Sequence, residues 1–179
     1  MKNFELCKYT FLHRKALNYL VNRVVLNNDL RNELVKRVEV HDVDKMLLYQ
    51  FFNPDDVHSW HKLNNSHHLD VNELSSDLDR YEAILDYESS AMTKPDKPLN
   101  AWSYITSNES TGKFSQDVYV DLIKKVGELH LNCEQCPHDY EYQSKVTEED
   151  IMYEIINFVT NNPEHPALKC VKEKKLIWR

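Results

Sequence analysis

Histidines and aspartates that could bind a metal ion are concentrated in the first half of this sequence. Six of the nine histidines lie between His13 and His68. Asp42 directly follows His41, and Asp86 lies further along the chain. Neutral imidazole and carboxylate groups together form a ligand set for first-row divalent metals. This half of the chain therefore predicts a site for a divalent cation.

The adjacent pair His41 and Asp42 restricts how an ion could be bound. We predict that the pair ends a helix over about 30–41, on which His41 continues an apolar face. Neighbouring residues on a helix diverge by roughly 100°, so one ion meets both only if it lies off the helix surface. Further ligands must come from other helices. His13 in the first predicted helix and Asp86 in the fifth are placed to supply them.

The helices that position these residues are predicted from apolar side chains that repeat every three or four residues. The chain has only two glycines, Gly112 and Gly127, and both lie outside the histidine-rich half. A phosphate-binding Gly-rich loop is therefore excluded there, and helices joined by polar loops are favoured. The helices are predicted at about 4–26, 30–41, 43–52, 57–62, 73–92, 99–105, 116–131 and 147–159.

The length of 179 residues predicts one all-α domain over 1–179. The metal-binding core is expected at about 4–105, with additional helices and the tail over 106–179. Val118, Leu122, Val126 and Leu129 are expected to pack inward, while the basic run 172–175 is expected to be solvated.

The net charge of −7 argues against a long nucleic acid as partner, because proteins that bind one usually present a basic face. A small phosphorylated ligand needs only local positive charge, which a metal ion can supply. Residues 1–12 lack the apolar segment of a signal peptide, and no run has the length of a membrane span. We therefore expect a cytoplasmic protein with reduced thiols and no membrane partner. The oligomeric state is left open.

Four short motifs follow one another in order: Phe11-Leu12-His13-Arg14-Lys15, His41-Asp42-Val43-Asp44-Lys45, the segment from His61 to His68, and the segment from Ile84 to Met92. On these motifs the chain resembles the HD (histidine-aspartate) superfamily of metal-dependent phosphohydrolases. It is similar in particular to a small HD-like family of bacterial and phage proteins. The resemblance implies an HD-like helical bundle that hydrolyses a small nucleotide or related phosphoester in a bacterial or phage-infected cytosol.

The resemblance also implies one divalent ion, of Mn, Fe, Co, Ni, Zn or Mg, with four protein ligands. These ligands are His13, His41, Asp42 and Asp86. Two-metal members of the superfamily use extra histidines for a second ion, and His61 with either His67 or His68 fits that role. The gap between these histidines is shorter than in the better-known two-metal enzymes, so the number of ions is left open.

Lys45 follows the His-Asp pair by three residues, where several HD enzymes place a lysine that contacts substrate phosphate. Enzymes that act on cyclic dinucleotides usually have glycine before that lysine, whereas this chain has Asp44. This departure weakens a cyclic-dinucleotide assignment but leaves the role of the lysine. Arg14, next to His13, is a second candidate for phosphate contact.

The chemistry expected at such a site is hydrolysis. A bound divalent ion lowers the pKa of its water to roughly 7–9 and so supplies hydroxide near neutral pH. Asp42 would bridge two ions, or hold one and orient the attacking water. His67 or His68 would protonate the leaving oxygen.

Two rival functions stay open at this point. Some HD-fold proteins hold two irons and activate dioxygen, and their ligands are also histidines and aspartates. A non-catalytic protein that binds metal or nucleotide is the second rival.

A second candidate metal site contains Cys133 and Cys136, which lie near His130 and His138, but all four residues fall within nine positions. A zinc site normally joins two separated ligand pairs, so we favour a loop with free thiols.

Overall fold

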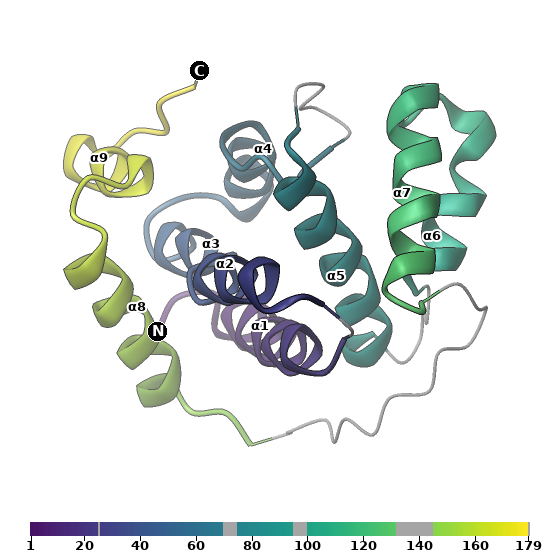
Figure 1. The fold of residues 1–179 in the computed structure, drawn as a ribbon. Helices are drawn as coiled ribbons and strands as arrows, with labels where there is room; N and C mark the ends of the chain where they lie inside the picture. Colours follow the sequence, from purple (N-terminus) through teal and green to yellow (C-terminus); the bar gives the residue numbers. More distant parts are fainter. Residues whose placement is uncertain (25, 70–74, 95–99, 132–144, 179) are drawn as a thin grey trace. The chain divides into compact units, whose positions relative to one another are not determined.

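The computed structural model describes residues 1–24, 26–69, 75–94, 100–131 and 145–178 (Figure 1). Within these residues the chain forms helices and no β-strand, so the all-α prediction is confirmed. A short 3-10 helix, η1 (Glu109–Thr111), follows α6. The α-helices are α1 (Phe4–Arg23), α2 (Asn28–Val38), α3 (Val43–Leu48), α4 (Pro54–Asn64), α5 (Asp77–Thr93), α6 (Ala101–Ser107), α7 (Gln116–Glu128), α8 (Glu148–Asn161) and α9 (Pro166–Glu173).

The chain divides into two compact units, each with its own apolar core. The first unit comprises Met1–Leu12, Val40–Asn65 and Gln143–Arg179. The second comprises His13–Glu39 and Ser66–Tyr142. Helix α1 therefore contributes residues to both units.

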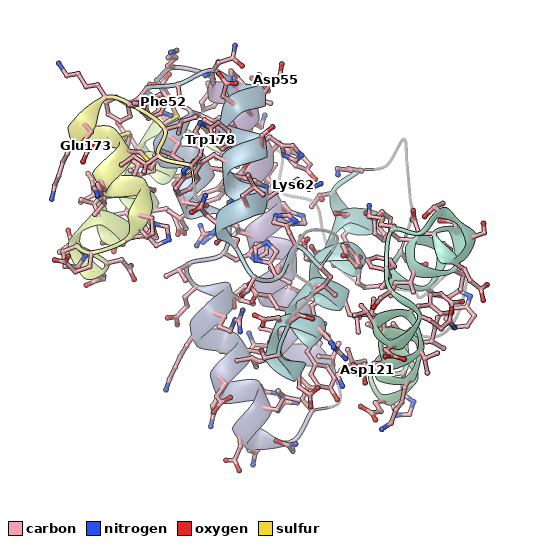
Figure 2. The ribbon with its side chains drawn as sticks, turned by 90° about the horizontal axis from the view of Figure 1, so that it is seen from above. Phe52, Asp55, Lys62, Asp121, Glu173 and Trp178 are labelled. Atoms are coloured by element: carbon pink, nitrogen blue, oxygen red, sulfur yellow. The ribbon has the colours of Figure 1, made fainter. Side chains whose placement is uncertain are left out.

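In the first unit, α3 packs against α4, α8 and α9. Trp60 of α4 is fully buried, and its indole Nε1 donates a hydrogen bond of 2.8 Å to the carbonyl oxygen of Ile177. Figure 2 shows the neighbouring Trp178 beside α4. The C-terminal segment is thus part of the core that fixes α3, the helix that begins directly after Asp42.

Local signals fix where the helices of this unit begin. The Asn53 side chain accepts a hydrogen bond from the backbone N–H of Asp55 at the start of α4, and Pro54 occupies its first turn. Thr147 and Asp150 form a capping box that opens α8. Helix α9, which His165 caps and Pro166 opens, was not predicted. Residues 172–175 are exposed, as expected for a solvated run.

In the second unit, α5 packs against α2, α6 and α7, and Figure 1 shows α6 and α7 side by side. The predicted inward stripe of α7 is buried, which confirms its role in the core; it consists of Val118, Leu122, Val126 and Leu129. Helix α5 begins at Asp77, four residues after the predicted start, because Ser76 and Asp79 form a capping box there.

No helix among the described residues is both long enough and apolar enough to cross a membrane. The cysteine-containing loop with Cys133, Cys136 and His138 lies outside the described residues.

Candidate metal centre

His41 and Asp42 lie in the turn between α2 and α3, and not at the end of a helix. Helix α2 ends at Val38, and Asp42 is the residue before α3, with φ 59° and ψ 2°. This left-handed conformation is uncommon outside glycine, although aspartate tolerates it better than most residues. The predicted helix over 30–41 was therefore too long. The turn, and not helical periodicity, sets the directions of the two side chains.

His61, near the end of α4, contacts Asp42. Its Nε2 lies 2.8 Å from Oδ1 of Asp42, and both side chains are buried. The Nε2 of His41 lies 3.7 Å from the same oxygen. Within the first unit, the imidazoles of His41 and His61 therefore both face Oδ1 of Asp42.

The other nitrogen of His61 is held by Asp44. Nδ1 of His61 lies 2.9 Å from each oxygen of the Asp44 carboxylate. The Asn65 amide nitrogen donates to Oδ2 of Asp44 at 3.1 Å. A carboxylate only accepts hydrogen bonds, so Nδ1 of His61 carries the proton in this contact. A carboxylate behind a metal-binding histidine fixes its tautomer and raises its basicity in this same way.

Charges balance one another around Asp42. The ammonium Nζ of Lys45 lies 2.7 Å from Oδ2 of Asp42. Burial alone would raise the pKa of the Asp42 carboxyl, but the charges of Lys45, His41 and His61 outweigh it and hold that pKa well below its usual range. Burial would likewise lower the pKa of His61, yet Asp44 and Asp42 outweigh burial and raise it.

This arrangement fits a divalent cation. One donor atom each of Asp42, Asp44 and His61 lie within 4.8 Å of one another, and all three residues are buried. The 2.8 Å between Nε2 of His61 and Oδ1 of Asp42 is close to the edge of about 3.0 Å in an octahedron with bonds of about 2.1 Å. His61 and Asp42 can therefore act as neighbouring ligands, while Asp44 orients the imidazole.

The second unit contains a similar pair on α1 and α5. Nε2 of His13 lies 2.6 Å from Oδ1 of Asp86. The Ser89 hydroxyl donates to the Asp86 backbone carbonyl at 2.8 Å, so it can accept from Nδ1 of His13 at 3.2 Å. His13 then presents Nε2 to a carboxylate, as His61 does in the first unit.

His67 and His68 lie next to each other in the second unit, with ring centroids 4.3 Å apart. His67 is buried, and its Nδ1 lies 3.5 Å from Oε1 of Glu82 on α5.

The predicted site residues are therefore found in two groups, one in each unit. The first contains His41, Asp42, Lys45 and His61, and the second contains His13, His67, His68 and Asp86. All of them except Lys45, His68 and Asp86 are buried. That His13, His41, Asp42 and Asp86 share one ion stays a prediction.

Arg14 has a structural contact. It is buried, and its guanidinium donates to the carbonyl oxygen of Glu39 at 2.6 Å, which ties α1 to the residue that follows α2. Its contact with substrate phosphate stays a prediction. His58 is exposed.

Asp44 and Glu82 were not among the predicted site residues. Asp44 is a buried carboxylate in the short helix α3, whose other buried residues are apolar. A charge in such a run is a signal that it has a specific partner, because an unpaired buried charge is costly. On α5, Glu82 belongs to a polar series with Asp79, Asp86 and Ser89 at steps of three, four and three. That spacing places the four on one helix face.

No family model, curated protein or solved structure matches this chain. The buried groups of histidine and aspartate support a metal site by their own chemistry.

Proposed function

We propose that this protein is a metal-dependent phosphohydrolase of the HD type, acting on a small nucleotide or a related phosphoester. The observation that carries the proposal is the His61 imidazole between two buried carboxylates. Its Nδ1 meets Asp44, and its Nε2 meets Asp42 at 2.8 Å. Such a side chain has a fixed tautomer and a second nitrogen aimed at a carboxylate oxygen, as a metal ligand requires.

In this proposal the ion would be held by four ligands, which are His41 and Asp42 from the turn before α3, His13 from α1 and Asp86 from α5. His61, with His67 or His68, would serve a second ion. When bound, the ion supplies a hydroxide near neutral pH and neutralises charge on phosphate oxygens. The His13–Asp86 pair at 2.6 Å supports this assignment, since both members have the donor atoms it needs.

Lys45 binds the phosphate of the substrate. Its ammonium is paired with Oδ2 of Asp42 at 2.7 Å, and its side chain is 14% exposed, so it can reach solvent from a largely buried position. A divalent ion at Asp42 would neutralise this carboxylate, and the ammonium of Lys45 could then form charge-assisted hydrogen bonds with a phosphate oxygen. His67 or His68 gives a proton to the leaving oxygen.

The substrate is small rather than polymeric. The chain has a net charge of −7, so attraction for phosphate comes from local cations and from the bound ion. A nucleoside monophosphate or a nucleoside triphosphate matches this requirement, whereas a long nucleic acid needs an extended basic face.

The test is a phosphate-release screen over nucleotides with Mn²⁺, Co²⁺, Ni²⁺, Fe²⁺ and Mg²⁺ on protein purified without chelator. We expect release with at least one ion, and its loss in Asp42→Ala. Asp56→Asn, which removes an exposed carboxylate of α4, is the control and should retain activity. Undiminished activity in Asp42→Ala would contradict the proposal, and a mixed-valent di-iron spectrum would favour the oxygenase chemistry instead.

A further inference from the structure

Glu82 is a buried carboxylate that the proposed reaction does not use. It lies on α5, one turn before Asp86, and only 3% of its surface is exposed. A buried carboxylate is stable as an ion only if a cation and hydrogen-bond donors compensate for its lost hydration. Its neighbours therefore indicate what it does.

Arg37 of α2 supplies the positive charge. Its Nε lies 2.6 Å from Oε2 of Glu82, and a second guanidinium nitrogen contacts Oδ1 of Asp79. Burial lowers the pKa of Arg37, but Glu82 and Asp79 outweigh it and raise that pKa. The guanidinium thus stays charged and bridges two carboxylates one turn apart on α5.

The other oxygen of Glu82 faces a histidine. Oε1 of Glu82 lies 3.5 Å from Nδ1 of His67, within the reach of an ion pair, and His67 is only 4% exposed. Next to His67, the Ser66 hydroxyl donates to Oδ1 of Asp79. The backbone that carries His67 is thus fixed to the same face of α5 that supplies Glu82.

An ionised carboxylate accepts hydrogen bonds and cannot donate them. A neutral His67 ring that faces Glu82 through Nδ1 therefore places its proton on Nδ1, and Nε2 keeps its lone pair. A lone pair on Nε2 is what a metal ligand or a proton acceptor needs. In this state His67 has no proton on Nε2 to donate, so of the two candidates His68 would protonate the leaving oxygen.

We propose that Glu82, held as a carboxylate by Arg37, is a positioning residue that fixes the Nδ1–H tautomer of His67 and leaves Nε2 to meet the ion or the substrate. The role of Nε2 rests on the proposed function. The tautomer does not, because Glu82 and Arg37 set it in the metal-free protein.

The direct test is nitrogen NMR of metal-free protein labelled with ¹⁵N-histidine, at pH 8, with His67→Gln used to identify the His67 signals. We expect the Nδ1–H tautomer in the unmodified protein. A ring protonated on Nε2, or on both nitrogens, would overturn the proposal. This measurement needs no variant of Glu82 to fold.

Glu82→Gln extends the test, because the amide has nearly the same shape and can either accept from Nδ1 or donate to it. We expect the Nε2–H tautomer to become populated and Mn²⁺ affinity to fall by about 10–100-fold. Asp77→Asn, the same change at a side chain of α5 that is 80% exposed, should alter neither quantity. An unchanged His67 tautomer in Glu82→Gln would overturn the proposal. Absence of Mn²⁺ binding in the unmodified protein would count against the proposed function, and the tautomer would still decide the role of Glu82.

Discussion

The Nε2 atom of His61 lies 2.8 Å from Oδ1 of Asp42, and both side chains are buried. Asp44 accepts a hydrogen bond from the other ring nitrogen, so in a neutral ring the lone pair of Nε2 would point at a carboxylate oxygen. In the proposed enzyme, a divalent ion would be bound by these two atoms.

Asp44→Asn should weaken binding of a divalent metal by about 10–100-fold, because a neutral amide makes His61 less basic and fixes its tautomer less strongly. Calorimetric titration with Mn²⁺ measures the effect. The matched control is Asp56→Asn, which removes an exposed carboxylate from the same unit and should bind Mn²⁺ as the unmodified protein does. Equal affinities in the two variants would show that Asp44 does not support a metal ligand.

Lys45→Gln should separate metal binding from substrate binding. Lys45 pairs with Asp42 at 2.7 Å, so its removal takes away a cation that competes with the metal, and Mn²⁺ affinity should not fall. The loss of a charge-assisted contact with phosphate, of about 1.5–3 kcal/mol, should lower kcat/KM by roughly 10–100-fold. Steady-state kinetics on the best nucleotide of the screen, with Lys169→Gln as an exposed control, makes the comparison. Weaker metal binding with unchanged kcat/KM would be the opposite of what we expect.

The sequence was sufficient to predict the helices with strong apolar periodicity and clear caps. The start of α8 was predicted within one residue because a capping side chain satisfies backbone N–H groups locally. Helix α4 begins at Pro54, three residues before its predicted start. Helix α9 was missed because Pro163 and Pro166 suggested an irregular tail. Pro166 in fact stands in the first turn, where proline is tolerated.

The site residues were harder to predict in detail. The left-handed conformation of Asp42 has no signal in its neighbours, and periodicity extended the helix through His41. Asp44 was interpreted only as a substitute for glycine, since its partner His61 lies 17 positions away in the sequence. Contacts between distant segments depend on tertiary packing, which local patterns do not specify.

Acid should destabilise the protein through Asp79. Burial would raise the pKa of this carboxyl, but hydrogen bonds from Ser66, Ser76 and Arg37 outweigh it and lower that pKa. An unfolded aspartate has a pKa near 3.9, so below about pH 4 the unfolded chain takes up this proton first. The stability that Asp79 contributes is therefore present above that range and is lost as pH falls toward the folded pKa.

Urea unfolding at pH 7 and pH 3.5 measures this dependence. Asp79→Asn should show a smaller drop in unfolding free energy between the two pH values than the unmodified protein. Asp117→Asn, at an exposed position in the first turn of α7, should keep the full drop. A drop of the same size in Asp79→Asn would contradict the assignment.

Trp60→Phe should destabilise the protein by about 2–4 kcal/mol. The change leaves a cavity at a fully buried position and removes the donor that pairs with the Ile177 carbonyl. Trp178→Phe is the matched control: Trp178 is 49% exposed, and its substitution should cost less than about 0.5 kcal/mol. Urea unfolding monitored by circular dichroism compares them. Similar losses in both variants would mean that the indole of Trp60 does not anchor the C-terminal segment.

The most direct test of the metal centre is anomalous diffraction from crystals grown with Mn²⁺. We predict a strong peak within bonding distance of Oδ1 of Asp42, with further ligands among His13, His41, His61 and Asp86. No peak at Asp42, or peaks only at exposed carboxylates, would contradict the claim that these buried side chains hold a divalent ion.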